Sequence, residues 1–345
     1  MKVKLGNEYI GDGEKTFIIA EIGVNHNGDI ELAKRMIKKA SQTGADAVKF
    51  QTFVAENIIS VNAKKAKYQE KNSKESSQFE MVKNLELTKK DFIELSKYAE
   101  SKNILFLSSP FDIKSVDLLD DIGVPGFKIG SGEINNFELI KHIENKDKPL
   151  IISTGMSTLD EIQETFDFIE NKDKLIILHC ITGYPSKIED ANLKFISTLK
   201  RQFKVPVGFS DHSPGIELAI ASIALGACII EKHFTLDKTL EGPDHQASLE
   251  PDEFKAMVTA IRNVEIAMGD GERKLCESEL EIKNVARKSV VANCDIPKGS
   301  ILDNTMLTIK RPGTGIEPKY LKSLIDKKTK VDIKKDDLIK YDYLI

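Results

Sequence analysis

The sequence has no tryptophan, only four cysteines and no long apolar segment. Cys180, Cys228, Cys276 and Cys294 stand far apart and form no CxxC pair, which is typical of reduced cytosolic thiols. Cys180 and Cys228 lie in apolar segments, where a buried thiol is expected. The longest apolar stretch, 218–230, is too short to cross a bilayer. These features argue against a membrane protein and against a disulfide-linked protein.

The sequence also lacks an excess of basic residues and an apolar N-terminal segment. Fifty Lys and Arg face 54 Asp and Glu, a formal net charge of −4, which argues against a broad nucleic-acid-binding surface. A few placed lysines can still hold a small anionic substrate. Residues 1–10 show no secretory signal, so we expect a cytoplasmic protein with no nucleic-acid or membrane partner.

Short apolar runs alternate with amphipathic stretches from Phe17 to about Met268. A typical amphipathic stretch begins at Asp29, a good N-cap, and stops at Gly44. Eight alternations over about 250 residues predict an α/β fold, a (β/α)8 TIM barrel, with a doubly wound open sheet as the alternative. The eight predicted strands are 17–23, 47–52, 105–109, 126–130, 150–154, 175–180, 206–210 and 228–234.

The composition changes after Met268. We expect the barrel to occupy residues 1–272 and a charged linker or linking helix to occupy 273–287. Residues 288–345 then form a small β-rich module, with short β patterns at 289–292 and 307–310. A module of this size is marginally stable alone.

Barrel enzymes carry their catalytic residues at the carboxyl ends of the strands. Nearly every predicted strand here ends in polar groups. One connection on that face, 54–86, is long, polar and Lys-rich, and it predicts a lid or substrate wall. The polar residues at or just beyond the strand ends include Glu21, Lys49, Gln51, Ser109, Lys128, Ser131, Glu133, Ser153, Tyr184, Ser210, His212, Glu231 and His233.

Lys49 and Lys128 lie inside apolar strands, where an unpaired ammonium group is costly. One interpretation is a pair of internal ion pairs, with Glu21 and Glu231 for instance. The other is an anion site in which both lysines face small hydroxyl groups, which suits a phosphate beside a carboxylate. The hydroxyl residues concerned are Ser109, Ser131, Ser153, Thr154 and Ser210.

Two histidines, His212 and His233, end neighbouring predicted strands and could reach one metal ion, with positions left for water and substrate. The alternative is that each hydrogen-bonds to a loop. His179 lies in an apolar run and is interpreted as a core histidine. Glu21 is a candidate acid or base, although it could simply pair with Lys49.

Several segments together resemble the sialic acid synthase family, which includes N-acetylneuraminate, legionaminic acid and pseudaminic acid synthases. The resemblance spans almost the whole chain. KRPGTGI at 310–316 resembles the antifreeze-like, or SAF, domain of that family. The other matching segments are AEIGVNHNGD (20–29), KFQTF (49–53), FKIGSGE (127–133), ISTGM (152–156), GFSDHSPG (208–215), EKHFTLDK (231–238) and GPDHQASLEP (242–251).

The resemblance implies a role for each matching residue. Phosphoenolpyruvate would be held by Lys49, Ser109, Lys128, Ser131, Ser153 and Ser210. His212 and His233 would bind a divalent metal ion, Mn²⁺ first, with Mg²⁺ or Co²⁺ as alternatives. Glu21 would be the catalytic carboxylate, acting with Lys49, Lys128 and the two histidines. The amino sugar would be contacted by Gln51, Glu133, Tyr184, Asp244 and, from the other subunit of a homodimer with swapped C-terminal domains, Arg311.

The implied reaction joins phosphoenolpyruvate and an N-acetylated mannosamine-type sugar, releasing phosphate. The sugar is either N-acetylmannosamine or 2,4-diacetamido-2,4,6-trideoxymannose. The stretch 63–87 is more similar to neuraminate and legionaminate synthases than to pseudaminate synthases, while TGYPSK at 182–187 departs from the family's usual TEYPTP. Alternatives are a Schiff-base aldolase using Lys49 or Lys128 and an ice-binding protein built on the C-terminal module.

Overall fold

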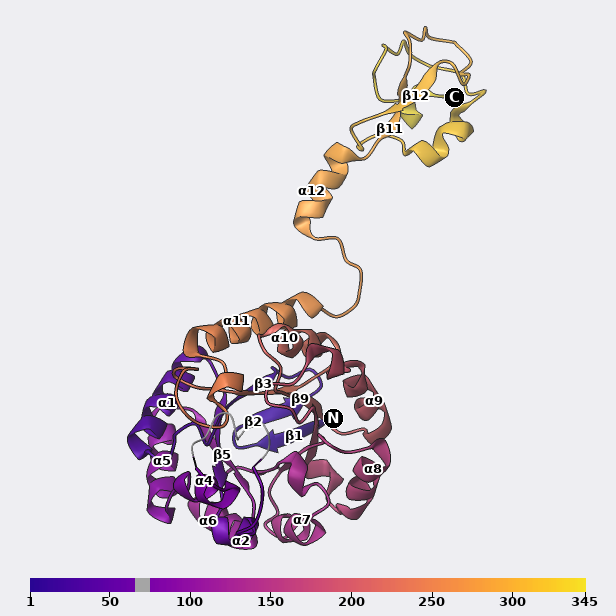
Figure 1. Ribbon diagram of the computed structural model, residues 1–345. Coiled ribbons are helices and arrows are strands. Elements are labelled where there is room, and N and C mark those ends of the chain that lie inside the picture. The colour runs from indigo at the N-terminus through magenta and orange to yellow at the C-terminus, as the bar shows by residue number, and fades with distance from the viewer. Residues whose placement is uncertain (66–74) are drawn as a thin grey trace. The chain divides into compact units, whose positions relative to one another are not determined.

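The computed structural model describes residues 1–65 and 75–345, which form two compact units, Met1–Gly269 and Asp270–Ile345. The first unit is the predicted TIM barrel (Figure 1). Its eight parallel strands follow the order β5-β4-β3-β10-β9-β8-β7-β6, and β5 also lies beside β6, so the sheet curls nearly closed. Each strand ends within one residue of its predicted bounds. The strands are β3 Phe17–Gly23, β4 Ala47–Thr52, β5 Leu105–Pro110, β6 Phe127–Ile129, β7 Leu150–Ser153, β8 Leu175–Cys180, β9 Val207–Asp211 and β10 Ile229–His233.

Helices surround the strands as an outer ring (Figure 1). The first shows why they form where they do. The Asp29 side chain accepts hydrogen bonds from the backbone N–H groups of Glu31 and Leu32, and Gly44 ends the helix at φ 87°, as predicted. The ring consists of α1 Ile30–Thr43, α5 Lys89–Ser101, α6 Ile113–Ile122, α7 Phe137–Glu144, α8 Leu159–Phe168, α9 Lys194–Phe203, α10 Glu217–Ala224 and α11 Pro251–Met268.

An N-terminal hairpin that the sequence did not predict precedes the barrel. Its strands, β1 Lys2–Leu5 and β2 Glu8–Gly11, pair antiparallel and lie across the centre of the ring in Figure 1. Val3, Leu5 and Ile10 are buried against residues from the amino-terminal parts of the barrel strands, so the hairpin closes that end. The partners are Phe17, Ile19, Ala47, Leu107, Ile151, Ile176, Leu178, Cys228 and Ile229.

The connection after β4 is more structured than predicted. Within 54–86 the structure contains α2 Ala55–Ile58 and α4 Gln78–Asn84, while 66–74 lies outside the described residues. The expectation of a loop is wrong for these two helices, because helices this short give no amphipathic period in the sequence. Ser77 caps α4 by accepting the N–H of Glu80.

The second unit contains α12 Glu277–Ala286 and the antiparallel pair β11 Ser289–Ala292 and β12 Leu307–Lys310, at the predicted positions. It has a small core of its own, which includes Val290, Leu302 and Leu324. Across the described parts of both units, no helix has the length and apolar character to cross a membrane.

Candidate active site

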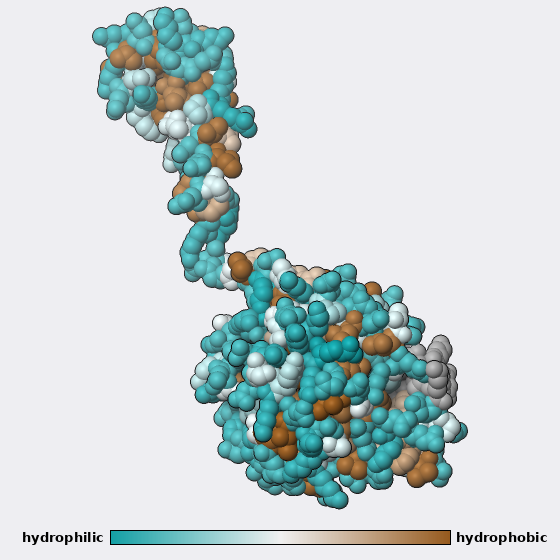
Figure 2. All heavy atoms as spheres, turned by 90° about the vertical axis from the view of Figure 1, so that its left-hand side faces the viewer, coloured by the Kyte–Doolittle hydropathy of each residue, from teal (hydrophilic) through white to brown (hydrophobic). Residues whose placement is uncertain are grey.

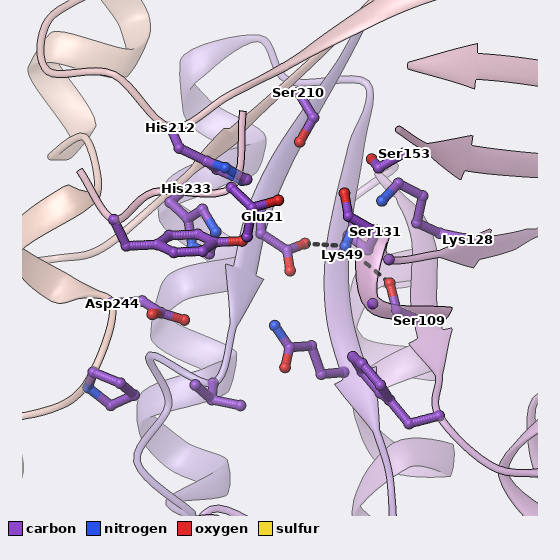
Figure 3. A pocket seen from close by; sticks show the side chains of 18 of the residues that line it. Glu21, Lys49, Ser109, Lys128, Ser131, Ser153, Ser210, His212, His233 and Asp244 are labelled. Atoms are coloured by element: carbon purple, nitrogen blue, oxygen red, sulfur yellow. Dashed lines mark hydrogen bonds and ion pairs between the residues drawn. The ribbon is translucent and has the colours of Figure 1, made fainter. Parts of the chain in front are cut away.

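The register of the barrel strands brings the predicted polar residues together at the carboxyl ends. Glu21 on β3 lies opposite Lys49 on β4 and opposite His233 on β10. Glu231 lies opposite Ser210 on β9. Because side chains alternate along a strand, Glu231 and His233 share one face of β10. Figure 3 shows the labelled side chains converging on one space from different strands.

These side chains line a single cavity of about 280 Å³. A concave site with several converging polar groups is the usual form of a small-molecule site. The convergence required by the anion-site interpretation is therefore present. The predicted site residues that line the cavity are Glu21, Lys49, Gln51, Ser109, Lys128, Ser131, Ser153, Tyr184, Ser210, His212, His233 and Asp244.

Two predicted sugar-binding residues are not among the described residues that line this cavity. Glu133 lies in the short 3-10 helix Ser131–Glu133, and its carboxylate accepts a hydrogen bond from Asn136 Nδ2 at 2.7 Å. That bond turns the carboxylate toward the start of α7, so this chain offers no support for a direct sugar contact by Glu133. Arg311 belongs to the second unit, where its Nε donates to the carbonyl of Ala286 at 3.0 Å.

The buried lysines form the ion pairs of the first interpretation and also line the cavity that the anion-site interpretation requires. Lys49 Nζ lies 2.7 Å from Glu21 Oε2 and 3.6 Å from Glu231 Oε2, and it donates to Ser109 Oγ at 3.0 Å. Lys128 Nζ lies 3.5 Å from Glu231 Oε1. The ion pairs named in the first interpretation exist, yet both ammonium groups still line the cavity (Figure 3). They can therefore be shared with an anion.

The two carboxylates differ in their pKa values although both are fully buried. Burial raises the pKa of Glu21 to about 7, against the attraction of Lys49. Burial acts in the same direction on Glu231, but Lys128 and Lys49 outweigh it and lower the pKa of Glu231 to about 2. Separated pKa values assign separate tasks to paired carboxyl groups. Glu21 can exchange a proton near neutral pH, whereas Glu231 stays an anion that holds the lysines.

The pKa values of the two lysines also depend on burial, which disfavours the charged form, and on the nearby carboxylates, which favour it. Burial disfavours charge on Lys49, but Glu21 and Glu231 outweigh it and raise its pKa. For Lys128 burial dominates, and its pKa is lowered despite Glu231. A bound anion would therefore stabilise the charged form of Lys128 more than that of Lys49.

From the sequence, Glu231 was expected only as an ion-pair partner of the buried lysines, and Thr182 was not expected at the site. Thr182 follows β8, and both residues line the cavity. The Ser153 and Thr182 hydroxyls are buried without a hydrogen-bond partner among the described residues, and such groups are uncommon unless a ligand or water completes them.

The Ser131 hydroxyl accepts the N–H of Gly155 at 2.9 Å, which leaves its own proton to donate. A side chain at position 155 would collide with Thr182 and Ser131, so glycine permits this close packing. Ser131 and Ser153 lie beside Lys128 (Figure 3), and Thr182 lines the same cavity.

The two candidate metal ligands stand side by side. The ring centroids of His212 and His233 are 5.4 Å apart, and the Tyr184 ring packs on His212 at 4.2 Å. His212 Nδ1 lies 2.9 Å from the carbonyl of Ile181, so Nδ1–H donates there and Nε2 keeps its lone pair. Burial, then the nearby His212 and Lys49, hold the pKa of His233 well below its usual range.

Two adjacent imidazoles are a chemically suitable donor set for a divalent ion, which they bind in the neutral form. Among residues 1–65 and 75–345, no cluster of three or more His, Cys, Asp or Glu side chains could hold a metal. The remaining ligands would therefore come from water and substrate.

Asp244 enters the cavity from the loop between β10 and α11. Burial raises the pKa of its carboxyl to about 6, against the attraction of His212. The loop is fixed by a hydrogen-bond chain in which Asn25 Nδ2 donates to Ser248 Oγ at 2.8 Å and Ser248 Oγ donates to the Asp244 carbonyl at 2.7 Å. The Asp244 carboxylate is thus held in place to accept hydrogen bonds from a ligand.

Residues interpreted as structural lie where expected. His179 Nε2 is 2.7 Å from the carbonyl of Ala191, and its ring packs against Phe209, so it is a core histidine. Cys180 and Cys228 are buried free thiols.

A barrel whose strand ends gather two lysines, serine hydroxyls and paired histidines defines a class of enzyme that binds a small anion beside a second substrate. The model of the NeuB family matches residues 36–273, and the model of the SAF domain matches residues 287–345. The chain therefore belongs to the NeuB family and ends in a SAF domain, which confirms the resemblance found in the sequence.

Relatives match along nearly their whole length. The N,N'-diacetyllegionaminic acid synthase of Campylobacter jejuni is 49% identical over 332 residues, covering 95% of this chain and 99% of that protein. The human N-acetylneuraminate-9-phosphate synthase is 39% identical over 334 residues, covering 96% and 93%. The crystal structure of N-acetylneuraminic acid synthetase from Leptospira borgpetersenii superposes with a TM-score of 0.72 at 38% identity, covering 81% of this chain and 94% of that one.

Proposed function

We propose that the chain condenses phosphoenolpyruvate with an N-acetylated mannosamine-type sugar and water, giving a sialic-type nine-carbon acid and phosphate. The chain is an enzyme of the acid synthase type, a carbon–carbon bond-forming transferase, like its relatives. The observation that carries the proposal is the single cavity that joins Lys49, Lys128, Glu21 and the two histidines.

The lysine side of the cavity suits phosphoenolpyruvate. Lys49 and Lys128 supply positive charge, and Ser109, Ser131, Ser153 and Ser210 supply hydroxyl donors around them. Ser210 Oγ now donates to Glu231 Oε1 at 2.8 Å and can turn to a ligand. In a buried site these interactions are stronger than in water and fix the orientation of the phosphate and carboxylate. Bound phosphoenolpyruvate would also accept hydrogen bonds from the Thr182 and Ser153 hydroxyls, which have no partner among the described residues.

The histidine side suits a divalent metal, for which Mn²⁺ is our first choice and Mg²⁺ or Co²⁺ the alternatives. His212 and His233 would hold it, because their rings lie side by side at the ends of neighbouring strands and His212 Nδ1 is engaged by the Ile181 carbonyl, which leaves Nε2 for the ion. Such an ion supplies Lewis acidity at an aldehyde oxygen when bound.

Glu21 lies between these two sides and is placed to manage the proton. Carbon 3 of phosphoenolpyruvate attacks the aldehyde carbon of the open-chain sugar, leaving positive character at carbon 2. Water adds there while Glu21 accepts its proton and passes it to the alkoxide formed from the aldehyde oxygen. The tetrahedral intermediate then forms the carbon 2 carbonyl and expels phosphate, which takes the proton of the added hydroxyl. A pKa near 7 lets Glu21 take up and release that proton at neutral pH. The fixed anion Glu231 keeps both lysines directed at the substrate.

Gln51, Tyr184 and Asp244 are the sugar contacts that the cavity supports. We also propose a homodimer with swapped C-terminal domains, in which Arg311 reaches the partner's sugar site. The supporting observation is α12, whose apolar side chains Leu280, Ile282 and Val285 are 46%, 62% and 69% exposed. Figure 2 shows such apolar residues at the surface of this segment. A second copy would cover them.

The test is phosphate release from phosphoenolpyruvate, with Mn²⁺ supplied and each candidate sugar added in turn. We expect sugar-dependent release and an equimolar nine-carbon acid. With ¹⁸O in the bridging oxygen of phosphoenolpyruvate, the label should leave in phosphate, because carbon–oxygen bond cleavage expels it. Label retained in the sugar acid would contradict the mechanism. Covalent trapping of pyruvate on Lys49 or Lys128 by borohydride would favour the aldolase alternative.

A further inference from the structure

The cavity has a second half that differs chemically from the phosphoenolpyruvate side. Seven apolar side chains form it, drawn from the end of β3, the end of β4, α2, α4 and the segment after β5. We call this set the apolar wall. Its members are Val24, Phe53, Ile58, Met81, Val82, Leu85 and Phe111.

The apolar wall is a packed structure that faces the cavity. Val24, Phe53, Met81 and Leu85 form a buried cluster, with 6%, 7%, 3% and 9% of their surfaces exposed. The rings of Phe53 and Phe111 meet edge to face at 6.2 Å. An apolar surface of this kind favours methyl and methylene groups and leaves a buried hydroxyl without a partner.

Positive charge is confined to the other half. Among the described residues that line the cavity, the only lysines are Lys49 and Lys128, and there is no arginine. An adjoining cavity of about 240 Å³ shares Met81, Leu85 and Pro243 with the first. Its described lining carries two acidic side chains, Glu75 and Glu241, and no lysine or arginine. Among the described residues that line the first cavity, no lysine or arginine beyond Lys49 and Lys128 faces a phosphate group at the far end of the sugar. Beside the second cavity, Lys65 Nζ donates to the Glu75 carbonyl at 2.6 Å.

The direction of the sugar follows from the proposed function, on which this inference rests. The aldehyde carbon must lie where carbon 3 of phosphoenolpyruvate can reach it, near Glu21 and the histidines. The acetamido group and hydroxyls next to that carbon then lie near Gln51 and Asp244. Carbons 4 to 6 are left to extend toward the apolar wall.

We propose that the apolar wall makes this enzyme select a sugar that is acylated at carbon 4, deoxygenated at carbon 6 and not phosphorylated. The 2,4-diacetamido-2,4,6-trideoxyhexoses are the matching class. Their carbon 6 methyl and carbon 4 acetyl methyl groups bury against the wall. N-acetylmannosamine instead presents hydroxyls at both positions, and its 6-phosphate would place two negative charges against the apolar wall.

The first measurement compares kcat/KM for three sugars at saturating phosphoenolpyruvate and Mn²⁺. We expect 2,4-diacetamido-2,4,6-trideoxymannose to exceed N-acetylmannosamine by at least about tenfold, the scale of pocket discrimination at one or two substituents. The 6-phosphate should be the poorest substrate. Equal or better turnover of either N-acetylmannosamine or its 6-phosphate would overturn the inference and leave the proposed function standing. No turnover of any of the three would overturn both.

Variants assign the preference to the wall. Met81→Gln places an amide of similar length there and should reduce the ratio of the two kcat/KM values severalfold, with the KM for phosphoenolpyruvate unchanged. Val82→Gln is the second variant, because Val82 is only half-buried and tolerates change better. Met268→Gln, at a 52% exposed position on α11, is the matched control and should leave the ratio unchanged. A ratio that stays constant in both wall variants, with melting temperatures preserved, would contradict the assignment.

Discussion

The two ends of the barrel are formed by the same eight strands but contain opposite chemistry. At the amino-terminal end, Leu5 and Ile10 of the hairpin are fully buried among apolar strand residues such as Ile176. At the carboxyl end, Glu21, Lys49, Lys128 and Glu231 are almost as deeply buried, with at most 4% exposed, yet all four are ionisable.

The two ends therefore contribute differently to the free energy of folding. Burying apolar surface stabilises a protein by about 25 cal/mol per Å². Burying charged groups costs free energy that ion pairing only partly recovers. The amino-terminal end can therefore stabilise the barrel while the carboxyl end retains charges for a ligand. If the two ends are independent in this way, a substitution at one end should change only the property that resides there.

The largest expected effect follows from Lys128→Met at the polar end. Loss of the ammonium removes a charge-assisted contact to the substrate anion, so kcat/KM for phosphoenolpyruvate should fall about 10³-fold. Unfolding free energy should be unchanged or higher, since burial already disfavours this charge. Steady-state kinetics and thermal melting measure the two, with the exposed Lys38→Met as control. Parallel loss of stability would break the proposed division between the ends.

Glu21→Gln tests proton transfer at the same end. The amide keeps the shape but cannot accept a proton, so kcat should fall about 10²-fold or more. The KM for phosphoenolpyruvate should change little, because both lysines keep Glu231. Glu31→Gln, at an exposed position on α1, is the control. A variant that loses phosphoenolpyruvate affinity but keeps kcat would show that Glu21 only positions Lys49.

Leu5→Ala alters the apolar end. Removing this fully buried side chain should lower the free energy of unfolding by about 2 to 4 kcal/mol. Chemical denaturation measures the loss, and kcat at a temperature where the variant is folded should be unchanged. Tyr9→Ala on the same hairpin, 54% exposed, should have little effect. A large loss of kcat in folded Leu5→Ala would show that the two ends are coupled.

The smallest effect concerns pH. The ionised Asp244 carboxylate accepts hydrogen bonds from sugar hydroxyls better than the protonated carboxyl does. Burial raises the pKa of Asp244 to about 6. Acidification below that value protonates it, so the KM for the sugar should rise about tenfold between pH 7 and pH 5. The sugar itself does not titrate in this range. Asp244→Asn should remove the dependence, and an unchanged dependence in that variant would assign it to another group.

The sequence predicted the eight barrel strands because fully buried strands are distinct apolar runs bounded by turns. It also predicted most of the candidate site, since polar residues at strand ends of a barrel meet on one face. It missed the hairpin and the helices α2 and α4, whose short segments carry no periodic signal. The orientation of the Glu133 side chain was not predictable either, because its hydrogen bond with Asn136 depends on local geometry rather than on sequence spacing.

Charge pairing was the hardest part to predict. The sequence left open whether Lys49 and Lys128 are in ion pairs or form an anion site. The structure contains the ion pairs with Glu231 and a cavity that both lysines line, and the anion site remains a prediction. Only the positions of the side chains show that Glu231 touches both lysines while the cavity remains open to them.

The proposed function requires one cavity to bind a phosphorylated three-carbon acid and a metal cation at the same time. Diffraction from crystals grown with phosphoenolpyruvate and Mn²⁺, with anomalous data at the manganese edge, tests it most directly. We predict an anomalous peak within bonding distance of His212 and His233, and phosphate density between Lys49 and Lys128 in the same cavity. Manganese bound away from both histidines, or phosphoenolpyruvate bound outside this cavity, would contradict the account.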